Sequence, residues 1–233
     1  MPILSNSKEI VTQEASLGAA LAKSGRAFVA VIGSGLSAQA ELPTWPALAT
    51  RLLADAQLKL TGNGQGMSLN DRVLARQISD GHLWRAMDTI RASLGADWEV
   101  CVQKQLRYEC PPNPPDSLLS LLSLPIAGVI SFNLDRLAEA AYATMIPTVP
   151  PNAGTSRDLQ FMRSGWTDQR FIFYPHGVLN RPDTWCLTKR DLDNLQGDAG
   201  YKEYWRRVLD LHTLLLVGID PSDVAVLPNL ICK

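Results

Sequence analysis

The segment that most constrains the fold is a short apolar run at residues 27–32, which ends directly in Gly33-Ser34-Gly35. Its β-branched and aliphatic residues predict a strand buried on both faces, as in a parallel sheet. Three more runs have the same character: residues 126–131, 171–174 and 213–217. Segments with helical patterning separate these runs. The sequence therefore predicts a three-layer α/β fold with a largely parallel sheet.

We interpret residues 1–233 as one domain that carries a small helical module at residues 46–110. The module shows helical periodicity and no strand pattern. Its apolar positions repeat over four segments, at residues 45–56, 69–78, 83–94 and 98–106. An alternative fits almost as well, in which these segments are crossover helices of the same sheet.

A proline-rich linker at residues 110–116 follows the module. Asp116 or Ser117 is expected to cap the next helix, at residues 118–122. Further helices are predicted at residues 136–142 and 201–211, whereas residues 147–168 show no sustained period and are predicted to form a loop.

Composition excludes several classes of protein. The four cysteines, Cys101, Cys110, Cys186 and Cys232, form no CxxC pair, so we expect no zinc ribbon and no metal site. The net charge of -1 is spread along the chain and gives no argument for direct binding to nucleic acid or to an anionic membrane. No apolar run is long enough to span a membrane, and the amino terminus lacks the pattern of a secretory signal. We therefore expect a cytoplasmic protein with reduced thiols.

Polar residues and glycines gather where the predicted strands end. Asn133 and Asp135 follow the second strand, His176 the third and Gly218 the fourth. In open parallel sheets, ligands bind beyond the carboxyl ends of the strands. The loop after the first strand would let its backbone come close to a ligand, and the next helix would offer free N–H groups to a phosphate.

Each of these residues also has a purely structural explanation. The glycine loop can be a tight turn, Asn133 can form an Asx turn, and Asp135 can be an ordinary acid in the first turn of a helix. His176 can be a turn histidine with its hydrogen bonds satisfied. Four further residues are assigned structural roles: Trp45 and Trp84 are read as core residues, His82 as a surface or capping group, and His212 as structural.

The motifs and their order resemble those of sirtuin-like domains, especially the zinc-free NADase domains of bacterial anti-phage defence. Gly33-Ser34-Gly35-Leu36-Ser37 with Leu42-Pro43-Thr44-Trp45 is similar to the first motif of that family. Ser131-Phe132-Asn133-Leu134-Asp135 is similar to its Thr-Asn-Tyr-Asp motif, and Pro175-His176-Gly177 to its His-Gly motif. Thr188 and Asp191 resemble the positions that follow, and Leu215-Leu216-Val217-Gly218 with Asp223 resembles the last glycine strand. Together these motifs span residues 27–223.

The resemblance implies a Rossmann-like sheet that binds NAD as a substrate, with the nicotinamide near Asn133 and Asp135. In the family the Asn is essential for glycohydrolase action and the His acts as a base. The residues implied to act in catalysis are Asn133, His176 and Asp135. Those implied to contact NAD are Gly33, Ser34, Gly35, Ser37, Trp45, Asn133, Asp135, Gly218 and Asp220.

The chain departs from the family pattern at three positions. Asp220 stands where Ser is common, so the binding of the adenosine end is in question. Phe132 replaces a hydroxyl residue, and Glu41 stands where glycine is usual.

The leading hypothesis is hydrolysis of NAD⁺ to nicotinamide and ADP-ribose by an anti-phage effector. Such domains commonly act as homo-oligomers with a sensor or activator protein or domain. Two alternatives remain open: a non-catalytic module that senses NAD or ADP-ribose, and an ADP-ribosyltransferase or deacylase of sirtuin type.

Overall fold

The computed structural model describes residues 27–61, 69–148, 150–159 and 170–219. Its centre is a five-stranded sheet in which every adjacent pair of strands is parallel, in the order β3-β4-β2-β1-β5. The strands are β1 (Ala27–Ile32), β2 (Ile126–Ser131), β3 (Asn152–Thr155), β4 (Phe171–Tyr174) and β5 (His212–Val217). The predicted α/β class with a parallel, Rossmann-like sheet is confirmed.

The four predicted strands are present, but the prediction of a loop at residues 147–168 is wrong in part. Residues 152–155 form the edge strand β3, which pairs with β4 from Asn152–Phe171 to Thr155–Tyr174. The sequence Asn-Ala-Gly-Thr lacks the apolar run that identifies a buried strand. An edge strand bonds to one neighbour only and needs less apolar surface.

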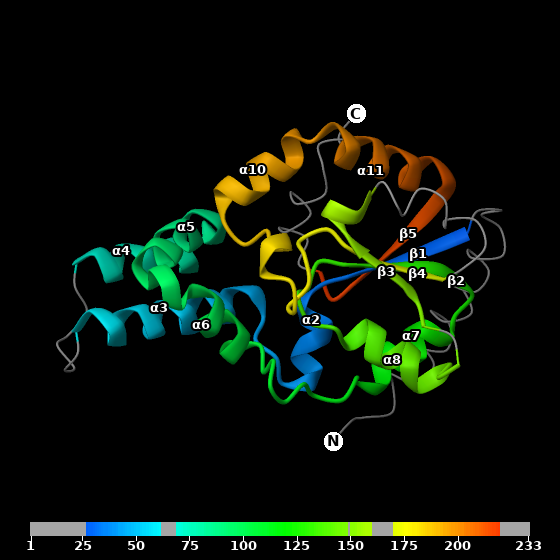
Figure 1. The fold of residues 1–233 in the computed structure, drawn as a ribbon, viewed down its shortest axis with the longest axis horizontal. Coiled ribbons are helices and arrows are strands. Elements are labelled where there is room, and N and C mark those ends of the chain that lie inside the picture. Colours follow the sequence, from blue (N-terminus) through cyan, green and yellow to red (C-terminus); the bar gives the residue numbers. More distant parts are fainter. Residues whose placement is uncertain (1–26, 62–68, 149, 160–169, 220–233) are drawn as a thin grey trace, which may run out of the picture.

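Helices cover both faces of the sheet (Figure 1). On one face, Phe28, Ala30 and Ile32 pack against α7 (Asp116–Ser123) and α8 (Leu137–Met145). On the other, Val29 and Val31 pack against α11 (Ala199–Leu211). Alternate residues of β1 thus point to opposite layers, as the pleat of a strand requires.

The cap predicted for α7 is wrong. The helix begins at Asp116, and its N-cap is Pro115, which makes no side-chain capping bond. Asp116 lies in the first turn, where a carboxylate still interacts favourably with the helix dipole.

Four helices lie together at one end of the molecule (Figure 1). They are α3 (Trp45–Thr61), α4 (Leu69–Ser79), α5 (Leu83–Leu94) and α6 (Trp98–Gln105). Their apolar faces share one core, which also takes in Leu134, Leu179, Trp185 and Leu187 from the loops after β2 and β4. These four helices therefore pack directly onto the edge of the sheet where its strands end.

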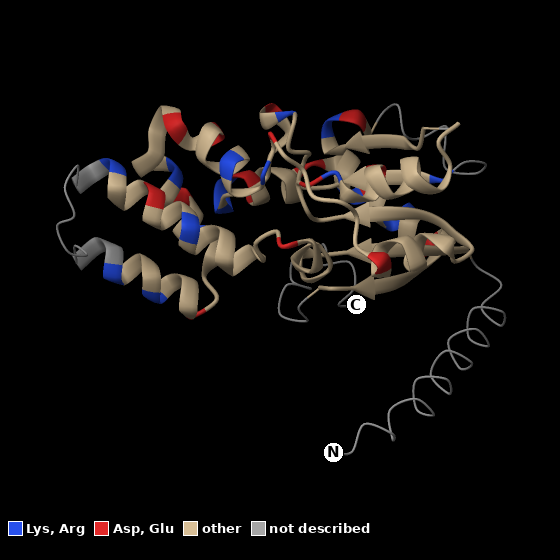
Figure 2. Cartoon of the chain, turned by 90° about the horizontal axis from the view of Figure 1, so that it is seen from below, with Lys and Arg blue, Asp and Glu red and all other residues tan. Residues whose placement is uncertain are grey.

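Shorter elements complete the described chain. They are α2 (Ser34–Ser37), η1 (Ala38–Ala40), η2 (Gly95–Asp97), η3 (Ser156–Asp158), η4 (Pro182–Thr184) and α10 (Lys189–Gly197). No helix of the described segments has the length and apolar character needed to cross a membrane. Acidic and basic residues are interspersed over the sheet region and the four-helix end (Figure 2).

Candidate functional site

A pocket lies where the carboxyl ends of the central strands meet the four helices α3–α6. Its empty volume, with the open mouth included, is about 760 Å³. Sixteen residues line it: Gly33, Ser34, Ser37, Pro43, Trp45, Leu48, Trp84, Leu106, Phe132, Asn133, Leu134, Asp135, His176, Leu187, Gly218 and Ile219. Residues from four separate strand ends therefore face one space.

Most of the residues expected to contact a ligand lie in this lining. The exceptions are Gly35, which does not line the pocket, and Asp220, which lies outside the described residues, as does Asp223. Trp45, which the resemblance implied would contact NAD, lines the pocket together with Trp84, which was assigned to the core from sequence. The sequence analysis also missed the apolar members Leu48, Leu106 and Leu187, which give no motif because only their packing brings them here.

The backbone of the glycine loop was expected to approach a ligand, but the N–H groups of Gly33 and Gly35 bond to the end of β5. The Gly33 N–H donates to Val217 O at 3.1 Å and the Gly35 N–H to Gly218 O at 2.9 Å. A side chain at either glycine would collide with Gly218 O, at 2.7 Å and 2.9 Å. These glycines are required because the loop packs against the end of β5, so neither N–H is free for a phosphate.

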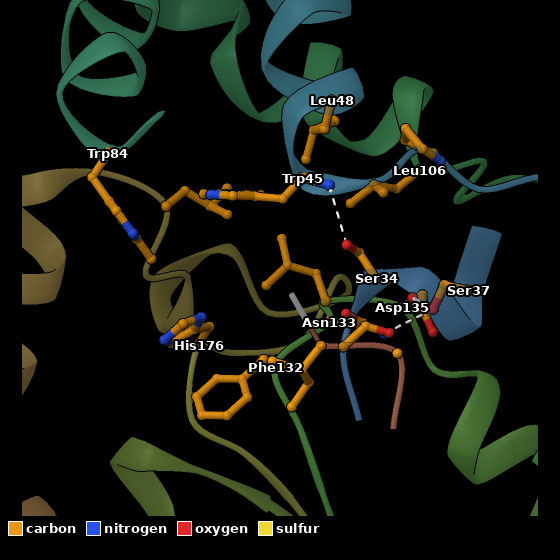
Figure 3. A pocket seen from close by; sticks show the side chains of 16 residues that line it. Ser34, Ser37, Trp45, Leu48, Trp84, Leu106, Phe132, Asn133, Asp135 and His176 are labelled. Atoms are coloured by element: carbon orange, nitrogen blue, oxygen red, sulfur yellow. Dashed lines mark hydrogen bonds between the residues drawn. The ribbon is translucent and has the colours of Figure 1, made fainter. Parts of the chain in front are cut away.

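A hydrogen-bonded chain joins the first and second motifs. The Asn133 amide donates through Nδ2 to Gly33 O at 2.9 Å and to Ser37 Oγ at 2.8 Å. The Ser37 hydroxyl in turn donates to Asp135 Oδ2 at 2.7 Å (Figure 3). Since Nδ2 is used in this way, the amide is oriented and Oδ1 accepts no hydrogen bond from any described residue. The alternative that Asn133 only forms an Asx turn does not account for these contacts.

Asp135 is buried between this chain and the start of α8. Its Oδ1 accepts the Leu137 N–H at 3.2 Å, so the acid also stabilises the first turn of that helix. Burial raises the pKa of the carboxyl group, and the hydrogen bonds from Ser37 and from the Leu137 N–H oppose that rise. Asp135 therefore has two roles: it stabilises the first turn of α8, and it lines the candidate site.

His176 lies at the other end of the pocket, between aromatic rings. The Phe132 ring is 4.8 Å from the imidazole centroid, and the Trp84 ring approaches edge-on at 5.4 Å (Figure 3). The Nε2 atom is buried and has no hydrogen-bond partner among the described residues. Burial lowers the pKa of His176 to about 3. In this arrangement the ring is neutral near pH 7, whereas the family resemblance implies that it acts as a base.

Trp45 and Trp84 form the wall above the polar groups. Their rings lie 5.3 Å apart, and the backbone N–H of Trp45 donates to Ser34 Oγ at 3.3 Å. That bond ties the first residue of α3 to the glycine loop. The four-helix end thus supplies one side of the pocket.

The remaining motif residues have structural roles. Thr188 and Asp191 form a capping box at the start of α10. Asp191 also pairs with Arg91 of α5 at 3.3 Å. His82 is exposed and precedes α5 without a capping bond, and His212 is buried at the start of β5. No group of three or more His, Cys, Asp or Glu that could hold a metal occurs in the described part of the chain.

A pocket of this kind, at the carboxyl edge of a parallel sheet with glycine, Asn and His at the strand ends, defines an α/β ligand-binding protein. Residues 127–230 match the family model of the SIR2-like domain, which supports a sirtuin-like family. The match includes β2, β4, β5 and the motifs that contain Asn133 and His176. SIR2-like domains use NAD, so the match is consistent with an NAD-using protein. A search among curated proteins found no match to the chain.

Proposed function

We propose that the protein is an NAD⁺ glycohydrolase, which cleaves the nicotinamide–ribose bond to give nicotinamide and ADP-ribose. The observation that supports this most is that Asn133 and His176 line one pocket, in which Asn133 Oδ1 accepts no hydrogen bond from any described residue. The SIR2-like match over both residues supports NAD as the substrate.

Cleavage of an N-glycosidic bond builds positive charge on the ribose, so nearby oxygens lower its barrier. In the proposal, Asn133 Oδ1 orders the attacking water or holds the nicotinamide carboxamide. Ser37 Oγ accepts a hydrogen bond from the Asn133 amide and so fixes its orientation. The Ser37 hydroxyl is fixed in turn because it donates to Asp135. Pre-oriented dipoles of this kind need no reorganisation when the bond breaks.

His176 has the role of a neutral hydrogen-bond acceptor for a ribose hydroxyl or for the incoming water. With a pKa of about 3 it is uncharged across the physiological range. A group this weakly basic takes a full proton only when the developing charge on its partner raises its pKa.

The test is release of nicotinamide from NAD⁺ by the purified full chain, over protein concentrations that cover any oligomer. We expect release by the wild type and its loss in Asn133→Ala and His176→Ala. An Arg85→Ala variant, at an exposed position of α5 outside the pocket, is the control and should keep wild-type activity. Failure of the wild type to release nicotinamide would reject the hydrolase.

A second candidate is a module that binds NAD or ADP-ribose without cleaving it. Two properties of His176 favour this candidate: its Nε2 atom is buried, and the pKa of its ring is lowered. Both make the ring a weaker base. Calorimetric binding together with recovery of intact NAD⁺ after long incubation would support the sensor.

We further propose that hydrolysis serves anti-phage defence by depleting NAD, in a homo-oligomer controlled by a sensor or activator protein or domain. The order of the motifs along the chain supports this context. Light scattering with and without NAD⁺ tests the oligomer, and a monomer under all conditions would reject that part.

A further inference from the structure

The pocket has two chemically different ends. Asn133, Ser37 and Asp135 form a polar end, whereas His176, Phe132 and Trp84 form an aromatic end (Figure 3). Trp84 comes from α5, and its ring is nearly perpendicular to the imidazole of His176, with the two centroids 5.4 Å apart. Only 6% of the surface of His176 is exposed. The second end is therefore tightly filled.

We propose that Trp84 is an acceptor-selectivity residue, which limits the nucleophile at this site to water by filling the space beside His176. This inference rests on the proposed function. If the carboxamide of nicotinamide occupies the polar end, the ribose carbon C1′ lies between the two ends. The acceptor then reaches C1′ from the aromatic end, where Trp84 and Phe132 flank the imidazole.

The aromatic array also explains why a large acceptor is excluded. Trp84 contacts His176 on one side and Trp45 on the other, so the three rings form a continuous wall. The backbone N–H of Trp45 donates to Ser34 Oγ, which ties the start of α3 to the glycine loop. A side chain of a partner protein would have to displace this wall, whereas a water molecule would not.

The reaction balances for water and for an alcohol alike. The C1′–N bond breaks and its electron pair leaves with nicotinamide. The acceptor oxygen forms the new C1′–O bond, and its proton passes to the solvent, assisted by His176. Water gives ADP-ribose, and an alcohol gives the corresponding O-alkyl ADP-ribose. No oxidant or reductant is required.

The experiment measures how NAD⁺ partitions between hydrolysis and alcoholysis in methanol, ethanol and 1-propanol, with products counted by mass spectrometry. We expect the wild type to give ADP-ribose with little propyl product. Removal of the indole in Trp84→Ala should raise the ratio of propyl product to ADP-ribose by ~10-fold or more, since pocket size discriminates at that level per methylene. Trp84→Phe should give an intermediate ratio.

Trp98→Phe is the matched control, because Trp98 is buried in the same four-helix core and does not line the pocket. It should partition as the wild type does. An unchanged ratio in an active Trp84→Ala or Trp84→Phe variant would overturn the role of Trp84 and leave the hydrolase intact. If Trp84→Ala fails to fold, the phenylalanine variant decides the question. Absence of nicotinamide release by the wild type without alcohol would instead reject the proposed function, and this inference with it.

Discussion

At the scale of single residues, the surroundings of a side chain decide what it can do. Asn133 is oriented because its Nδ2 is bound on both sides, by Gly33 O and Ser37 Oγ. His176 is neutral because its aromatic neighbours exclude water. Neither property is visible in the local sequence, since the partners lie far away along the chain.

Burial of His176 makes stability depend on pH. Its folded pKa of about 3 lies below the ordinary value of 6.5. Between these values the unfolded chain binds a proton at His176 that the folded chain does not. This group therefore does not lower the free energy of unfolding above pH 6.5, and it lowers that free energy progressively as the pH falls from 6.5 toward 3. A single group can change stability by about 1.4 kcal/mol per pH unit in this window.

The measurement is urea denaturation of the wild type and His176→Phe from pH 7 to pH 4. The variant should lose stability less steeply, because phenylalanine fills the aromatic site and cannot titrate. Asp135, whose pKa is raised, acts in the opposite sense in both proteins and cancels in the comparison. Parallel pH dependences would contradict the buried neutral imidazole.

Ser37 links the two polar residues of the site, so its removal should affect both. Ser37→Ala leaves the Oδ2 atom of the buried Asp135 without its donor, which typically costs about 1–3 kcal/mol of stability. It also removes one of the two acceptors that orient the Asn133 amide, so nicotinamide release should fall. Ser37→Thr keeps the hydroxyl and should retain more activity than Ser37→Ala. Full activity in the alanine variant would contradict the linking role.

At the scale of elements, the contact between the glycine loop and β5 holds the site together. Gly218 has a φ of 65°, and a side chain there would meet Leu36 N at 2.5 Å. Gly218→Ala should therefore reduce thermal stability strongly, by more than the ~1 kcal/mol of the left-handed backbone alone. Gly197→Ala, at the end of α10 with open space around it, should be neutral or stabilising. Equal melting temperatures for Gly218→Ala and the wild type would contradict the tight contact.

Elements with strong local patterns were predictable, and those that depend on distant partners were not. The four predicted strands have continuous apolar runs, and the helices of residues 45–106 have clear periodicity. Strand β5 nevertheless lies at an edge of the sheet and is only partly buried, although its apolar run predicted burial on both faces. Strand β3 has no such run and exists because β4 offers it a free edge. The polar site residues were found because parallel strands bring their carboxyl ends together. Trp84 was not predicted to line the site, since it reaches His176 only through the packing of α5 with α3 and α10.

At the scale of the whole molecule, one apolar core joins the four helices to the loops that follow β2 and β4. Leu134 and Leu187 line the pocket and also belong to this core. Binding at the pocket and packing of the helices are therefore coupled.

This shared core predicts a single unfolding transition. Far-ultraviolet circular dichroism and tryptophan fluorescence should give coincident curves on heating. Ile90→Ala, at a fully buried site of α5, should lower the midpoint temperature of both curves by the same amount. It should reduce the free energy of unfolding by roughly 2–5 kcal/mol. Two separated transitions would mean that the four helices fold independently of the sheet.

The central claim is that the pocket hydrolyses the bond between nicotinamide and ribose. The most direct measurement is a short incubation of NAD⁺ with the wild-type protein in ¹⁸O-labelled water, followed by mass spectrometry. The account predicts unlabelled nicotinamide and ADP-ribose carrying one ¹⁸O atom, with neither product from Asn133→Ala. Intact NAD⁺ after prolonged incubation, or label in mononucleotides from cleavage of the pyrophosphate, would contradict it.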